Sequence, residues 1–122
     1  MIDFKNGSFV KLRKVNNPPT DYVALLIEGE VVIGAYQGIR DYVIFTNKRI
    51  IAVNVQGMTG KKKDYTSLPY SKAQAFSIET SGVFDLDSEL EVYYSSIGLI
   101  KFEFTGASDI VAIGRALGQF IL

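Results

Sequence analysis

The sequence predicts a mainly β protein that ends in one C-terminal α-helix, with a small open barrel as the simplest architecture. Runs of five to eight residues rich in Val, Ile, Tyr, Phe and Thr follow one another from residue 30 onward, with turn signals about every ten residues. Residues 108–122 then change to the apolar spacing of a helix. The helix would close the gap of the barrel.

The composition is that of one folded domain. The chain has 122 residues, of which 48% are hydrophobic and 21% are charged, close to the usual values for globular proteins. We therefore predict a single domain over residues 1–122. It would comprise an N-terminal extension with a short helix at 1–27, strands at 30–105 and the helix at 108–122.

The charge balance and the missing residue types exclude several functions. A formal net charge of zero argues against nucleic acid as the main partner, because phosphate binding depends on Lys and Arg. The chain has no His and no Cys, which are the usual zinc ligands and the usual nucleophile and base. We predict no cofactor, no metal and no enzymatic activity. With no secretory signal and no long apolar run, a cytoplasmic location is expected.

The first 27 residues carry the least regular pattern. Residues 2–15 fit either a short helix or a peripheral strand, and the pattern does not separate the two. Pro18 and Pro19 end any regular element, because each proline removes a backbone donor and fixes φ. A brief helix is expected over residues 20–27.

Seven strands are expected after this region. Tight reversals at 47–48 and 57–60 separate neighbouring strands, and a three-residue loop at 96–98 would place Leu90 opposite Phe104. Seven strands at regular spacing favour an antiparallel barrel or sandwich. The strands are expected at 31–37, 40–46, 49–56, 62–68, 72–80, 88–95 and 99–105.

Three of these strands are apolar on both faces, at 31–36, 42–45 and 50–53. One face covers the core. The other needs a cover from the N-terminal segment or the helix, or a contact with another subunit. An open barrel also has free strand edges, which favours self-association.

The helix carries two glycines. Its core face is formed by apolar residues at 110, 113, 117 and 120 or 121. Gly114 and Gly118 lie one turn apart, and each costs about 1 kcal/mol relative to alanine. Such a pair indicates a close approach to a strand or to a neighbouring subunit.

Several short phrases occur in order along the chain and together carry a family resemblance. They read GE at 29–30, GIRD at 38–41, FTNKRI at 45–50, QGMTGKK at 56–62, SLPY at 67–70, ETSG at 79–82 and FDLDSEL at 84–90. The ordered set resembles the bacterial pleckstrin-homology-like (PH-like) family over about residues 25–122.

The resemblance implies a fold and an assembly. The fold would be a PH-like barrel of two nearly orthogonal antiparallel sheets, with about seven strands and one capping helix. The assembly would be a cyclic homo-oligomer, a pentameric ring whose adjoining strands form a polar surface for other proteins. The resemblance implies no enzymatic activity.

An acidic strand is the first candidate site. Asp85, Asp87, Glu89 and Glu91 alternate with other residues, so that one face of a strand carries four carboxylates. A calcium loop is excluded, because the position that needs glycine is a leucine. The face is either solvated and partly balanced by Lys101, or a docking surface whose like charges call for a cationic counterpart.

Arg40 and Asp41 complete the candidate protein-interaction surface. The two residues occupy a motif-like turn, where they would form a surface ion pair. Alternatively, Arg40 would bind a partner carboxylate with two hydrogen bonds. The expected partners are further copies of this chain and an unidentified protein.

A basic set is the candidate surface for an anionic ligand. It comprises Lys48, Arg49, Lys61, Lys62 and Lys63. The alternative function is therefore a peripheral membrane module that binds anionic lipid headgroups through a basic hairpin. PH domains that bind phosphoinositides gather Lys and Arg at the first hairpin, where this chain has one arginine beside an aspartate. Lipid binding is therefore not favoured over a soluble, charged hairpin end.

Overall fold

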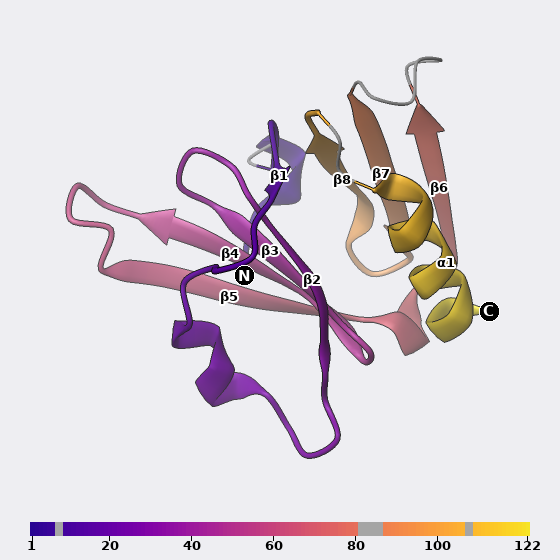
Figure 1. Ribbon diagram of the computed structural model, residues 1–122, viewed down its shortest axis with the longest axis horizontal. Helices are drawn as coiled ribbons and strands as arrows, with labels where there is room; N and C mark the ends of the chain where they lie inside the picture. The colour runs from indigo at the N-terminus through magenta and orange to yellow at the C-terminus, as the bar shows by residue number, and fades with distance from the viewer. Residues whose placement is uncertain (7–8, 81–86, 107–108) are drawn as a thin grey trace.

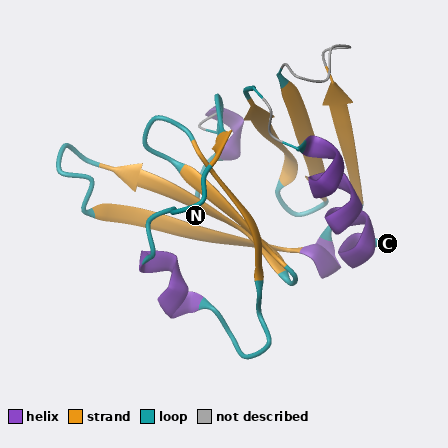
Figure 2. Cartoon of the chain, in the orientation of Figure 1, coloured by secondary structure: helices purple, strands orange, loops and turns teal. Residues whose placement is uncertain are grey.

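The fold consists of two antiparallel sheets and one α-helix. The computed structural model describes residues 1–6, 9–80, 87–106 and 109–122 (Figure 1). One sheet has five strands in the order β1-β2-β3-β4-β5, and the other has three in the order β6-β7-β8. Helix α1 packs against the three-stranded sheet (Figure 2). The predicted fold class is confirmed.

The elements follow one another in simple chain order. They are η1 (Phe4–Asn6), β1 (Arg13–Lys14), η2 (Asp21–Leu25), β2 (Val32–Gln37), β3 (Tyr42–Thr46), β4 (Arg49–Gln56), β5 (Lys62–Pro69), η3 (Tyr70–Lys72), β6 (Ala75–Thr80), β7 (Ser88–Tyr94), β8 (Gly98–Phe104) and α1 (Ile110–Ile121), where η denotes a 3-10 helix.

The seven expected strands correspond to β2–β8, and two of them start two or more residues later than expected. β3 begins at Tyr42 instead of residue 40, because the Gly38 amide donates to the Asp41 carbonyl in a turn. β6 begins at Ala75 instead of residue 72, because residues 70–72 form η3. In the same way, the brief helix expected at 20–27 is the 3-10 helix η2.

The predicted register of the last hairpin is wrong by two residues. Leu90 lies opposite Phe102, not Phe104, and the loop is residues 95–97. Gly98, with φ of 103°, begins β8 instead of ending the loop. Because side chains alternate with a period of two, the shift leaves the apolar set on the same face.

After the 3-10 helix η1, residues 9–14 of the N-terminal segment are extended and join the two sheets. The Leu12 amide donates to the Glu103 carbonyl, and the Glu103 amide donates to the Phe9 carbonyl, both at 2.9 Å. β1 then pairs with the end of β2. Lys11, between these two contacts, has a left-handed φ of 54°. The open choice between helix and strand is thus settled in favour of a bridging strand at residues 9–14, while residues 4–6 form the 3-10 helix η1.

The main core lies between the sheets and is rich in aromatic side chains. Phe9 contacts Phe102 edge to face, with ring centroids 5.6 Å apart. Tyr36 makes the same type of contact with Phe104 at 5.0 Å. Phe9, like the strand residues it contacts, is almost fully buried, so the N-terminal segment is part of the core.

A second apolar cluster covers the outer face of the five-stranded sheet. Tyr22 of η2, with Val15 and Leu26, packs on side chains of β2–β5. Asp21 fixes η2 there by accepting hydrogen bonds from Tyr42 at 2.7 Å and Tyr65 at 2.6 Å and by pairing with Lys63. The N-terminal segment of the same chain therefore covers this apolar face, so a neighbouring subunit is not needed to cover it.

Helix α1 explains one of the two glycines. A Cβ on Gly114 would lie 2.2 Å from Cδ1 of Ile78 in β6, so the close approach to a strand is confirmed at this position. A Cβ on Gly118 would meet only Leu122 of the same chain end, at 4.0 Å.

Within the described residues, no helix combines the length and apolar character needed to span a bilayer.

Candidate functional site

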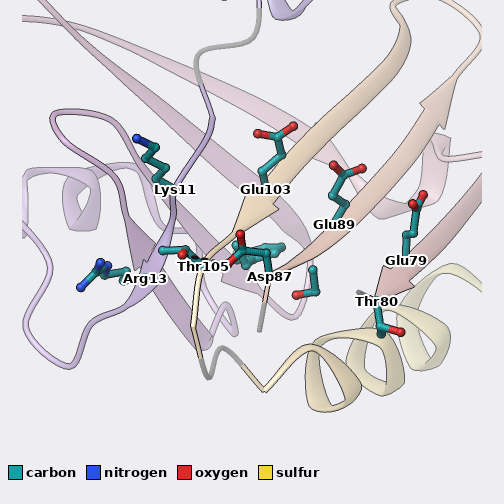
Figure 3. A pocket seen from close by; sticks show the side chains of 10 residues that line it. Lys11, Arg13, Glu79, Thr80, Asp87, Glu89, Glu103 and Thr105 are labelled. Atoms are coloured by element: carbon teal, nitrogen blue, oxygen red, sulfur yellow. Dashed lines mark hydrogen bonds between the residues drawn. The ribbon is translucent and has the colours of Figure 1, made fainter. Parts of the chain in front are cut away.

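A row of three glutamates crosses the outer face of the three-stranded sheet. Glu79 of β6 lies directly opposite Glu89 of β7, and Glu89 lies directly opposite Glu103 of β8. Figure 3 shows the three carboxylates side by side and pointing the same way. We call these three residues the acidic row. Like charges at directly opposed positions of a sheet are destabilising, so the row is present at a cost to stability.

The acidic row borders an open hollow of about 580 Å³. Its other wall is formed by the N-terminal segment, where Lys11 and Arg13 are both exposed (Figure 3). The hollow is lined by Lys11, Arg13, Glu79, Thr80, Asp87, Ser88, Glu89, Glu103, Phe104 and Thr105.

The carboxylates on the outer face of the three-stranded sheet suit a cationic side chain better than a metal ion. The carboxylate oxygens of Glu79, Glu89 and Glu91 lie within 4.8 Å of one another, and such oxygens are the ligands of hard cations. However, the Lys101 ammonium already lies 3.7 Å from Glu89. All three carboxylates also reach the surface, where acidic groups gain little from holding an ion.

The structure shows part of the predicted acidic strand and adds to it. Glu89 and Glu91 point outward from β7, and Glu91 lies opposite Lys101. Asp87 precedes β7 and accepts a hydrogen bond from Thr105 at 2.9 Å. Asp85 lies outside the described residues.

Sequence reasoning missed Glu79 and Glu103. The signal was present, because both alternate with core residues of their own strands, as Glu103 does with Phe102 and Phe104. The two-residue error in register hid the fact that Glu103 lies opposite Glu89.

Arg40 and Asp41 lie apart from the acidic row. The Arg40 guanidinium donates to the Gly57 carbonyl, and Asp41 accepts from the Val55 amide at 2.9 Å and the Asn54 side chain at 3.2 Å. They line a separate hollow of about 240 Å³. In this structure both residues hold the β2–β3 turn against β4.

Arg49, a member of the basic set, is bound to a carboxylate of its own chain. Its guanidinium donates to both carboxylate oxygens of Glu30 at 2.9 Å, and also to the Ser67 hydroxyl and the Leu25 carbonyl. The Glu30 side chain is fully buried. Bidentate, charge-assisted pairs of this kind are strong and directional.

The basic set is therefore split. Lys63 pairs with Asp21, while Lys48, Lys61 and Lys62 remain exposed. Lys61 and Lys62 lie at the end of the β4–β5 hairpin, which extends away from the rest of the molecule at the left of Figure 1. Two lysines on a projecting hairpin form a smaller basic surface than the five residues of the set suggested.

The Arg49–Glu30 contact also explains two phrases of the sequence pattern. The GE phrase at 29–30 and the FTNKRI phrase at 45–50 lie against each other. The side-chain amide of Asn47 donates to the Gly29 carbonyl at 3.0 Å, and the Thr46 hydroxyl donates to the Glu30 carboxylate at 2.7 Å. These phrases fix the approach of the chain to β2.

Acid is expected to weaken the fold through Glu30. Hydrogen bonds from Arg49 lower the pKa of Glu30 to about 2 from an ordinary 4.5, although burial acts in the opposite direction. A carboxyl whose pKa is lowered by folding stabilises the fold above its unfolded pKa. This stability is lost as the pH falls from 4.5 to about 2.

Urea unfolding at a series of pH values measures this loss. In a Glu30→Gln variant, which cannot titrate at this position, the free energy of unfolding is expected to change less with pH in the same range. If it changed equally in both proteins, the assignment to Glu30 would be contradicted.

The chain resembles known bacterial proteins both in sequence and in fold. The sequence model of the family described as "Bacterial PH domain" matches residues 3–121. The chain is similar to the uncharacterised protein YozO of Bacillus subtilis, with 36% identity over 98 residues, covering 80% of this chain and 84% of YozO. It is also 49% identical over 75 residues to the uncharacterised protein YjqA of the same organism, covering 62% of this chain and 60% of YjqA.

The fold matches crystal structures of bacterial proteins. A DUF1696 family protein with a pleckstrin-homology domain from Shewanella loihica superposes with a TM-score of 0.79 at 34% identity, covering 93% of this chain and 99% of that one. A pleckstrin homology domain from Shewanella amazonensis gives a TM-score of 0.63 at 33% identity, covering 88% of this chain and 94% of that one.

Proposed function

Because this chain belongs to the bacterial PH domain family, we propose that it is a non-enzymatic interaction module with two properties. It assembles with copies of itself into a cyclic homo-oligomer, for which the family resemblance implies a pentameric ring. Its acidic row docks basic protein surfaces, either of a neighbouring copy or of a separate partner protein.

The observation that carries the proposal is the register of the acidic row. Three carboxylates directly opposite one another repel. Lys101, at 3.7 Å from Glu89, and the cations Lys11 and Arg13 on the opposite wall of the hollow offset part of this repulsion. A cationic surface placed over the row would remove the repulsion. Electrostatic complementarity of this kind mainly sets the orientation and rate of association.

The distribution of charge within the chain supports self-assembly. The net charge is zero, yet the acidic row lies on the three-stranded sheet and the exposed Lys61 and Lys62 lie at the tip of a hairpin of the other sheet (Figure 1). A contact between two different surfaces of identical chains is heterologous, and such contacts generate rings when the rotation closes.

Light scattering after size exclusion tests the proposal. The wild-type protein is expected to elute as an oligomer, and Glu89→Lys with Glu103→Lys is expected to elute as a monomer. Glu28→Lys changes an exposed carboxylate remote from the row in sequence and is expected to leave the mass unchanged. A wild-type monomer at micromolar concentration would overturn the self-assembly.

A further inference from the structure

The upstream half of β2 has an unpaired edge. On the side away from β3, β1 pairs only with Tyr36 and Gln37, and the Val15 amide donates to the Ala35 carbonyl at 3.0 Å. The chain then leaves the sheet. In the described part of the chain, no strand pairs with residues 32–34 on this side. Such an edge presents backbone donors and acceptors to an incoming strand.

A small apolar cavity lies beside this edge. Its volume is about 60 Å³, and it separates Ile33 and Gly34 of β2 from Ala112 and Ala116 of α1. A space of this size takes a small aliphatic side chain and is far smaller than the pockets that hold cofactors. The remaining apolar lining comprises Tyr36, Phe45, Tyr70, Ile113 and Leu117.

The surroundings of the edge are apolar and electrically balanced. Val31, Val32 and Ile33 are exposed by 61%, 37% and 46%. The cavity wall contains one basic residue, Lys14, and one acidic residue, Asp109. The two charges offset each other, so the site matches an uncharged occupant.

We propose that this edge binds an extended, uncharged peptide segment of a partner protein as an added strand antiparallel to β2. The segment continues the line of β1 beyond Val15. Its backbone pairs with residues 32–34, one aliphatic side chain enters the cavity, and the next covers the exposed Val32. This mode of recognition takes affinity from backbone hydrogen bonds and specificity from alternate side chains. The site is separate from the acidic row and does not depend on it.

A titration with a defined peptide tests the proposal. The probe is acetyl-Ser-Val-Thr-Val-Ser-amide, added to ¹⁵N-labelled protein and followed by amide chemical shifts. The expected result is saturable shifts at residues 32–34, Ala112 and Ala116, with slower amide exchange along β2. A control peptide that is N-methylated at both valines keeps the side chains but loses two donors, and it is expected to bind at least about tenfold more weakly.

Two neighbouring substitutions on α1 separate the cavity from the rest of the helix. Ala112 lines the cavity, whereas Val111 is 67% exposed and does not. Ala112→Phe is expected to fill the cavity and weaken peptide binding at least about tenfold. Val111→Phe is expected to leave the affinity for the peptide unchanged. Thermal unfolding of both variants checks that α1 is intact.

Three results would overturn the proposal. The first is the absence of saturable shifts up to about 1 mM peptide, the weak end of measurable specific binding. The second is equal binding by Ala112→Phe and the wild-type protein. The third is protection of the β2 edge that rises with protein concentration without peptide, since the occupant would then be a second copy of this chain.

Discussion

Replacing Arg49 with alanine is expected to lower the free energy of unfolding by about 3–5 kcal/mol, the range for breaking one partner out of a buried ion pair. The Glu30 side chain is fully buried and receives two hydrogen bonds from the Arg49 guanidinium. Without the guanidinium, a buried carboxylate either remains charged and unpaired or takes up a proton. Both outcomes destabilise the folded state.

Urea unfolding of matched variants measures this effect. Lys48→Ala, at the adjacent exposed position, is expected to change the stability by less than about 0.5 kcal/mol. The double variant Glu30→Ala with Arg49→Ala is expected to lose less than Arg49→Ala alone, because it leaves no unpaired charge. If Arg49→Ala lost no more stability than Lys48→Ala, the Arg49–Glu30 pair would contribute nothing measurable to the fold.

Phe9→Ala is expected to destabilise the protein by about 3–5 kcal/mol, as large-to-small substitutions of buried aromatic residues do. Phe9 is only 2% exposed, and it contacts Phe102 of β8 and Phe4 of η1. Phe9 is not part of either sheet. However, hydrogen bonds to Glu103 hold its segment against β8, so its ring belongs to the core and its removal is expected to lower the free energy of unfolding.

Val10→Ala is the matched control for this substitution. Val10 is the next residue of the same segment and is 39% exposed, so its truncation is expected to cost well under 1 kcal/mol. Chemical unfolding compares the two variants with the wild-type protein. Equal losses would show that the bridge acts through the backbone alone, without the ring of Phe9.

The sequence predicted those parts of the fold that depend on periodicity. β4 was predicted over the residues it occupies, from Arg49 to Gln56, because both its faces are apolar and clear turns limit it. Residues 2–15 could not be assigned, because the pairing that makes Leu12 part of a bridge lies about 90 residues away, at Glu103 and Phe104. Local pattern carries no information on such a contact.

The candidate sites were predictable to a smaller extent. Alternation placed Glu89 and Glu91 on an outer face, and the structure agrees. Alternation within one strand could not reveal that Glu79 and Glu103 flank Glu89, because this depends on register across three strands. Nor could the spacing of charges show that Arg49 is bound to Glu30, which lies 19 residues earlier.

In the proposed assembly, the acidic row of one copy binds the Lys61–Lys62 hairpin of a neighbouring copy. A mixture of two charge-reversed variants tests this contact. One carries Lys in place of Glu79, Glu89 and Glu103, and the other carries Glu in place of Lys61 and Lys62. By light scattering, each variant alone is predicted to be a monomer. The equimolar mixture is predicted to form oligomers in which the two variants alternate. Because a ring of five subunits cannot alternate throughout, these mixed oligomers are expected to be open chains or rings with an even number of subunits. A mixture that stays monomeric, while the wild-type protein assembles, would contradict the claim.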